Sequence, residues 1–141
     1  MYVYLIAAIV IIWMLFVGTK PKPYHKLVKM DGFEFERYIT RLYAHMGYKA
    51  YTTKASGDFG ADVIARKGKE KLCIQCKYYK NPVGIEAVQQ AVASLGYYKG
   101  TKAVVVTNST YTDAAKTLAK KNNAILIDGP ILRKMVNKYM K

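Results

Sequence analysis

The chain has 141 residues, of which 52% are hydrophobic, and its 23 basic and 9 acidic residues give a formal net charge of +14. We expect this length to hold one folded domain and little else. The positive charge favours a polyanionic partner, either nucleic acid or an anionic membrane surface, with a merely soluble basic surface as the alternative.

The first 19 residues contain no charged side chain and are dense in Ile, Val, Leu and aromatic residues. As a helix they would extend about 27 Å, close to the roughly 30 Å hydrocarbon thickness of a bilayer. A cleaved secretory signal is the alternative. Such a signal has basic residues before its apolar run and small residues at its cleavage site, and this segment has neither. We therefore expect residues 1–19 to form an uncleaved transmembrane helix.

Residues 20–29 form a basic juxtamembrane linker with four lysines and no acidic residue. Because positively charged residues beside a membrane helix stay in the cytoplasm, the domain that follows is expected on the cytoplasmic side. The same lysines would attract anionic headgroups by about 1 kcal/mol each. The sequence thus predicts a single-pass protein of the cell membrane, with one domain over residues 30–141.

That domain begins with an amphipathic helix, because apolar residues recur at helical spacing over residues 35–46 and Gly47 follows as a terminator. Residues 48–54 are rich in Tyr and Thr, which predicts a strand. Two further short strands are expected over residues 62–66 and 72–77, joined by a turn whose length and glycine suit a hairpin. Three successive strands indicate a meander.

The second half of the domain predicts a crossover into the same sheet. A helix is expected over residues 85–95, followed by a strand over residues 103–106 whose continuous apolar run indicates burial on both faces. Another helix starts at Thr112, residues 124–127 form a last short strand, and residues 131–140 form a terminal helix. The expected architecture is an α/β sandwich around a central mixed sheet.

Three polar side chains of the predicted hairpin point to a catalytic centre. Successive side chains of a strand alternate between its faces, so Gln75 and Lys77 share one face and the apolar residues between them share the other. Asp62 opens the neighbouring strand. If the two strands pair, a carboxylate, an amide oxygen and an ammonium group converge on one spot.

Six short motifs follow one another along residues 30–136. Together they resemble the catalytic domain of Mrr-like restriction endonucleases, which belong to the PD-(D/E)xK nuclease superfamily. The resemblance implies a restriction-endonuclease-like α/β/α sandwich and metal-dependent hydrolysis of DNA, as in type IV restriction enzymes. The motifs are Gly32-Phe33-Glu34-Phe35-Glu36, Ser56-Gly57-Asp58-Phe59-Gly60-Ala61-Asp62, Gln75-Cys76-Lys77, Pro82-Val83-Gly84, Val106-Thr107-Asn108 with Ala114-Ala115, and Leu126-Ile127-Asp128-Gly129.

The resemblance also implies a role for each site residue. Asp62 is similar to the family's metal-binding acid, and Gln75 stands where the superfamily more often has Glu or Asp. Lys77 resembles the lysine that positions or activates water, and Glu36 resembles the acid of the first helix, a further metal partner. The backbone carbonyl of Cys76 would be another ligand. The implied cofactor is Mg²⁺, with Mn²⁺ as a substitute, because a hard cation prefers oxygen ligands.

Two of these assignments have alternatives. Asp58 is a rival of Asp62 as metal ligand, but the glycines around it favour a role in the turn. Cys73 and Cys76 have the spacing of half a zinc site, yet an offset of three on a strand points them to opposite faces, which predicts buried core thiols.

Contacts to nucleic acid are expected around the same site. Backbone contacts are assigned to Lys54, Arg66, Lys67 and Lys80, with Gln89 on the following helix. The pairs Tyr78-Tyr79 and Tyr97-Tyr98, each followed by a lysine, suit base stacking, with packing of one ring face into the core as the alternative.

The sequence as a whole predicts a membrane-anchored, Mg²⁺-dependent endonuclease that acts on DNA, including foreign or modified DNA. A non-catalytic membrane tether for nucleic acid is the alternative from another class, and an RNA-directed nuclease of the same fold is a third. Because one site attacks one strand at a time, cutting both strands would require a homodimer or a partner protein that also supplies specificity.

Overall fold

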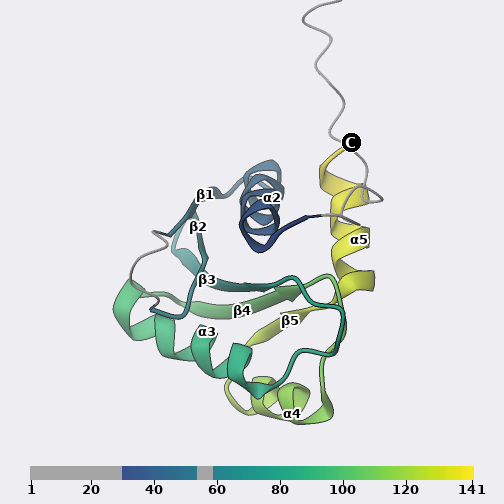
Figure 1. Ribbon diagram of the computed structural model, residues 1–141. Helices are drawn as coiled ribbons and strands as arrows, with labels where there is room; N and C mark the ends of the chain where they lie inside the picture. Colours follow the sequence, from purple (N-terminus) through teal and green to yellow (C-terminus); the bar gives the residue numbers. More distant parts are fainter. Residues whose placement is uncertain (1–29, 54–58) are drawn as a thin grey trace, which may run out of the picture.

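The computed structural model describes residues 30–53 and 59–141, and every structural statement below concerns these residues. Helices and strands alternate along them around one sheet (Figure 1). In chain order the elements are α2 (Gly32–His45), β1 (Lys49–Thr52), β2 (Val63–Lys67), β3 (Glu70–Lys77), α3 (Ile85–Tyr98), β4 (Lys102–Thr107), α4 (Asp113–Lys121), β5 (Ile125–Ile127) and α5 (Gly129–Tyr139).

The sheet has five strands in the order β1-β2-β3-β4-β5. The first three pair in antiparallel fashion, while β3, β4 and β5 run parallel to one another. The chain passes from β3 to β4 through α3, because two parallel neighbours need a long crossover connection. The predicted meander, crossover and mixed sheet are therefore confirmed.

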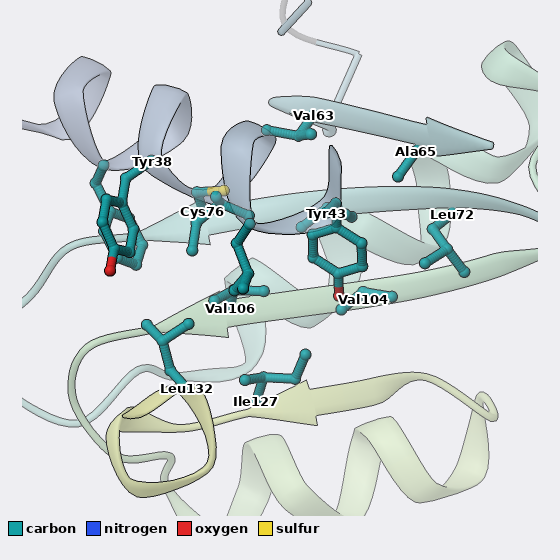
Figure 2. Close-up of a cluster of buried hydrophobic side chains, with 14 of the residues drawn as sticks. Tyr38, Tyr43, Val63, Ala65, Leu72, Cys76, Val104, Val106, Ile127 and Leu132 are labelled. Atoms are coloured by element: carbon teal, nitrogen blue, oxygen red, sulfur yellow. The ribbon is translucent and has the colours of Figure 1, made fainter. Parts of the chain in front are cut away.

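Helices cover both faces of the sheet, with α2 and α5 on one face and α3 and α4 on the other (Figure 1). The larger core lies under α2 and α5, and Figure 2 shows how Val63, Cys76 and Val106 gather there with Leu132 of α5. Strand β4 is buried on both faces, as its apolar run predicts, since its valines alternate between the two cores. The α/β/α sandwich is thus the observed architecture.

Helix α2 begins and ends where its sequence dictates. The Asp31 side chain accepts a hydrogen bond from the Glu34 N–H at 2.7 Å, and the Glu34 side chain accepts one from the Asp31 N–H at 3.1 Å, which is a capping box. Phe35 and Leu42 lie on the buried face of the helix, and each buried side chain of this size contributes about 1.5–3 kcal/mol. Gly47 follows at φ +91°, a conformation that favours glycine.

The terminal helix α5 begins two residues before its predicted start. The Asp128 side chain caps it by accepting a hydrogen bond from the Ile131 N–H at 3.0 Å, and Pro130 occupies the first turn. Proline fits there because its missing N–H would have no partner inside the helix. The cap residue, which apolar periodicity does not detect, sets the true boundary.

Residues 1–29 lie outside the described residues, and with them the predicted transmembrane helix and basic linker. Lys54 and Asp58 also lie outside them. Across 30–53 and 59–141, no helix combines the length and the apolar character needed to cross a bilayer.

Candidate active site

Asp62 bridges two residues of β3 from its position just before β2. Its N–H donates to the carbonyl oxygen of Ile74 at 2.8 Å, and its Oδ2 accepts a hydrogen bond from the N–H of Cys76 at 2.9 Å. Asp62 therefore lies beside Gln75, the residue between these two. The predicted pairing of the two strands is confirmed, and it brings the carboxylate next to the amide side chain.

Gln75 is a buried polar residue in the middle of this arrangement. Only 5% of it is exposed, and its Oε1 has no hydrogen-bond partner among the described residues. A buried amide oxygen without a partner costs about 1–3 kcal/mol, so such a group in a folded protein calls for an explanation. Its strand neighbours Ile74 and Cys76 belong to the core under α2, so Gln75 projects to the α3 face.

Lys77 lies on the same strand face as Gln75 and is partly exposed at the end of β3. Its Nζ sits 5.8 Å from the centre of the Tyr79 ring, within the range of a cation–π contact. Asn108 holds the backbone of Tyr79 with two hydrogen bonds: Oδ1 accepts from the Tyr79 N–H at 2.8 Å, and Nδ2 donates to the Tyr79 carbonyl at 2.9 Å. The loop after β4 thus fixes the segment that follows Lys77.

Three charged candidate site residues, Asp62, Glu36 and Lys77, influence the pKa of the buried Cys76 thiol. Burial raises the pKa of Cys76 well above its usual value, the carboxylates of Asp62 and then Glu36 raise it further, and Lys77 opposes them. All three charges therefore lie within electrostatic range of Cys76. Glu36 comes from α2, on the opposite side of the sheet from α3, so a site that included it would draw on both layers.

A tight contact with α3 positions the segment before Asp62. Gly60 has a φ of +86°, and a Cβ at this position would overlap the carbonyl oxygen of Gln90. Thr53 adds a second restraint, because its hydroxyl donates to the Ala61 carbonyl at 2.8 Å and its N–H donates to the Asp62 carbonyl at 2.9 Å. Only glycine at position 60 allows both the turn and this close approach.

The donor set suits a hard divalent cation with few charged ligands. Across the described ranges, no group of three or more His, Cys, Asp and Glu side chains gathers where it could hold a metal ion. A site here would instead combine the Asp62 carboxylate with the neutral oxygen of Gln75. The buried Oε1 without a partner fits this role, since an oxygen-preferring cation would satisfy it. The Cys76 carbonyl stays a predicted ligand.

The residues predicted to hold nucleic acid do not share one surface. Arg66 and Lys67 are neighbours on β2 and so project to opposite faces. The Nζ of Lys67 donates to the Met46 carbonyl at 3.2 Å and lies 5.4 Å from the Tyr48 ring, which gives it a local role under α2. Lys80 is exposed in the loop after β3.

On α3, the predicted contact Gln89 is exposed, whereas the adjacent Gln90 turns its Oε1 into a buried position without a hydrogen-bond partner in the described part of the chain. Gln90 is also the residue that packs on Gly60. Of these two α3 glutamines, Gln90 is therefore the one that contacts the segment before Asp62.

The two cysteines are free thiols on opposite faces, as the strand spacing predicts. Cys73 packs against Ile64 under α3, and Cys76 belongs to the core under α2 (Figure 2). Burial raises the pKa of both thiols. A zinc site shared by the two is ruled out by this geometry.

Sequence reasoning gave Asn108 and Thr53 no role, although both bind the backbone beside a candidate catalytic residue. Asn108 belongs to one of the motifs of the family resemblance, and this was the available signal. The Ile127-Asp128-Gly129 motif supports it, because the Gly129 N–H donates to the Ser109 carbonyl at 2.9 Å and a Cβ at Gly129 would overlap the Asn108 carbonyl. Thr53 offers no comparable signal in the sequence.

The sequence matches the restriction endonuclease family, of Mrr type, over residues 27–136. One curated relative is the type IV methyl-directed restriction enzyme EcoKMrr of Escherichia coli (strain K12). It is 26% identical over an alignment of 112 positions, which covers 73% of this chain and 37% of that enzyme. The chain therefore spans little more than a third of this relative's length.

The fold is similar to two solved structures. The DNA modification-dependent restriction endonuclease AspBHI superposes with a TM-score of 0.58 at 20% identity, over 75% of this chain and 31% of AspBHI. The MspJI restriction endonuclease, solved in complex with a 27-mer oligonucleotide, superposes with a TM-score of 0.56 at 24% identity, over 72% of this chain and 27% of MspJI. These likenesses concern the fold alone. With the family match over residues 27–136, they lead to one conclusion: this chain belongs to the Mrr-type restriction endonuclease family.

Proposed function

We propose that this protein is a metal-dependent endonuclease that hydrolyses phosphodiester bonds of DNA, including foreign or modified DNA. The observation that carries the proposal is the position of Asp62 beside Gln75. The carboxylate is tied to β3 by the Cys76 N–H, and the adjacent amide oxygen is buried without a hydrogen-bond partner among the described residues. The named activity of the curated relative is consistent with this reaction.

Each site residue has a distinct proposed role. Asp62 and Gln75 would hold Mg²⁺ or Mn²⁺ with their oxygens, aided by the Cys76 carbonyl and Glu36. When bound, the cation supplies positive charge at the scissile phosphate and favours deprotonation of the attacking water. Lys77 would add a point charge where negative charge develops and orient that water. The chain's own contribution is thus to place two oxygens and one ammonium group around a single phosphate.

We also propose that residues 1–19 anchor the protein in the cell membrane, with the nuclease domain in the cytoplasm. The uncharged apolar composition of this segment and the four lysines after it support the proposal. Membrane fractionation tests the anchor, and protease accessibility in inverted and right-side-out vesicles tests the orientation. Recovery of the full chain in the cytosolic fraction would overturn both.

Plasmid cleavage tests the nuclease proposal. The full chain in detergent micelles is incubated with methylated and unmethylated supercoiled plasmid, in Mg²⁺, in Mn²⁺ or in chelator. We expect cleavage only with a divalent cation, and its loss in both Asp62→Ala and Lys77→Ala. Lys121→Ala is the matched control, because it removes one positive charge from an exposed position at the end of α4.

The other outcomes separate the alternatives. DNA binding without cutting, unchanged in Asp62→Ala and Lys77→Ala, would contradict the enzyme and support a non-catalytic tether. Cleavage of an RNA transcript but not of DNA would assign an RNA substrate. Cleavage rates that rise with the square of protein concentration would indicate a homodimer, the arrangement required for cutting both strands.

A further inference from the structure

Exposed aromatic rings gather beside the candidate active site. Phe59, which is 47% exposed, stacks on Tyr97 of α3 with ring centres 3.7 Å apart and planes 9° from parallel. Tyr97 is 59% exposed, and Tyr51 on β1 is 53% exposed. Large apolar surfaces are rarely left in water without a partner when they are grouped, so this group indicates a binding surface.

The rings are connected to the site by short, packed contacts. Tyr97 meets Tyr98 edge to face at 4.8 Å, and Tyr98 packs against the small core cluster that contains Ile64. Tyr51 pairs with Ile64 across β1 and β2, so its side chain lies on the same face. Phe59 precedes Asp62 by three residues, which limits the distance between their Cα atoms to about 11 Å.

Positive charges cross the sheet on the same face. Lys49 lies opposite Arg66, and Arg66 lies opposite Lys71, so three basic residues on three adjacent strands are side by side. Like charges directly opposite each other destabilise a sheet. Within the described ranges, none of the three side chains forms an ion pair with a carboxylate. Such a row is suited to an anionic partner that neutralises it.

The order of these groups along β2 sets the geometry of a partner. Asp62, Ile64 and Arg66 are every second residue along the chain, so their side chains lie on the same face of the sheet. The aromatic rings lie beside Ile64, the middle residue of the three. Four residues of strand separate Asp62 from Arg66, or about 13 Å. Ile64 itself is fully buried, so a ligand would run over the exposed rings beside it, with the candidate catalytic carboxylate at one end and the positive charge at the other.

We propose that Tyr51, Phe59 and Tyr97, together with Lys49, Arg66 and Lys71, form an aromatic–basic surface that binds single-stranded DNA. Bases stack on aromatic rings and cations follow the phosphates, which is how proteins bind single strands without reading sequence. In a duplex the base faces are covered by their neighbours, so only unpaired nucleotides can use these rings. The claim that this strand is the one cleaved rests on the proposed nuclease function. The substrate class is then DNA with unpaired nucleotides beside the scissile bond.

Binding without cleavage tests the surface directly. The full chain in detergent micelles and chelator is titrated into a fluorescein-labelled 20-nucleotide oligo(dT) and into a 20-base-pair duplex. Phe59→Leu keeps an apolar side chain and removes the aromatic face, and Tyr97→Leu does the same from α3. We expect each to weaken oligo(dT) binding about tenfold and duplex binding less than about twofold. Phe59→Trp retains an aromatic face and should restore tight binding, which separates stacking from a folding defect.

The salt dependence of binding tests the row of basic residues formed by Lys49, Arg66 and Lys71. The double variant Lys49→Gln/Arg66→Gln should weaken oligo(dT) binding and lower the slope of log K against log salt by about 1.4. Lys120→Gln/Lys121→Gln is the matched control, because it removes two exposed charges from the end of α4. An equal change of slope in both double variants would overturn the assignment of a specific row.

Other outcomes overturn the proposal while leaving the nuclease function intact. Equal loss of oligo(dT) and duplex binding in Phe59→Leu would mean that the rings do not read unpaired bases. Tighter binding of oligo(rU) than of oligo(dT) would assign the surface to RNA. Unchanged binding together with a changed sedimentation coefficient would assign it to contact between copies of the chain. Conversely, stacking-dependent binding by a protein that cuts no DNA would support the surface and contradict the nuclease.

Discussion

The Oδ2 atom of Asp62 accepts a hydrogen bond from the backbone N–H of Cys76 at 2.9 Å. One carboxylate oxygen therefore fastens the start of β2 to the strand that carries Gln75 and Lys77. The same side chain has a structural and a proposed catalytic task, and substitutions can separate the two.

Asp62→Asn and Asp62→Ala should both abolish metal-dependent cleavage, since neither supplies a carboxylate to a cation. Only the alanine should cost much stability, because asparagine can still accept the Cys76 N–H with its amide oxygen. We expect Asp62→Ala to lower the free energy of unfolding by about 1.5–3 kcal/mol and Asp62→Asn by less than about 1 kcal/mol. Urea unfolding measures both values. Equal destabilisation would show that the charge, not the hydrogen bond, supports the fold.

Gln75→Leu should separate stability from function. It removes a buried amide whose Oε1 has no partner in the described structure, so the free energy of unfolding should stay within about 1 kcal/mol of the parent or rise. Cleavage should fall at least about 100-fold if this oxygen is a ligand. A destabilised but active variant would contradict the ligand role.

Gln75→Glu tests the same position with a charge. Burial and the nearby Asp62 would raise the pKa of the introduced carboxyl above its usual value near 4.3. A group with a raised folded-state pKa stabilises the fold below its unfolded pKa, and this stability is lost as pH rises through the folded pKa. In chelator the variant should therefore lose stability relative to the parent between about pH 4 and pH 8. Mg²⁺ should restore it, as thermal unfolding at several pH values would show.

Asn108→Ala should lower the turnover number rather than substrate affinity, because Asn108 holds the Tyr79 backbone next to Lys77. We expect kcat to fall about tenfold with KM changed less than about twofold. Asn122→Ala, which also removes a side-chain hydrogen bond to the backbone but at the C-terminal end of α4, is the control. Combining Asn108→Ala with Lys77→Met should lower kcat no further than Lys77→Met alone. Additive losses of kcat would contradict a role for Asn108 that acts through Lys77.

Gly60→Ala should be among the most damaging small substitutions in the domain. A Cβ there would overlap the Gln90 carbonyl, and the φ of +86° at this position strains any residue other than glycine. The two effects together should lower the free energy of unfolding by about 2–4 kcal/mol. Gly68→Ala is a close match, since Gly68 also has a positive φ of +59° but no atom within 4 Å of the added Cβ. Gly68→Ala should therefore lower the free energy of unfolding by only about 1–2 kcal/mol. Similar losses of stability in both variants would mean that α3 shifts to make room for the Cβ at position 60.

Both cysteines should resist alkylation in the folded protein. The thiolate is the reactive form, and burial raises the pKa of Cys73 and of Cys76, so little thiolate forms at pH 8. Iodoacetamide at pH 8 followed by mass spectrometry should find neither modified until denaturant is added. Fast labelling of Cys76 alone would indicate that the core under α2 opens near the site.

The sequence by itself determined the secondary structure in broad terms, the meander of the first three strands and the crossover into the same sheet. Helical spacing predicted α2, a continuous apolar run predicted β4, and glycine predicted the β2–β3 hairpin, because these signals depend on neighbouring residues alone. Strand alternation also assigned Gln75 and Lys77 to one face. The start of α5 was misplaced by two residues, since the Asp128 cap is polar and carries no periodic signal.

Only the tertiary structure decided which distant groups meet. The Asp62 to Cys76 hydrogen bond, the clamp of Asn108 on Tyr79 and the packing of Gly60 on Gln90 join segments 14 to 30 residues apart. The same holds for the stack of Phe59 on Tyr97 and for the face to which Lys67 projects. Local sequence fixes which side of an element a residue occupies, whereas contacts between elements depend on register and helix packing, which the whole core sets together.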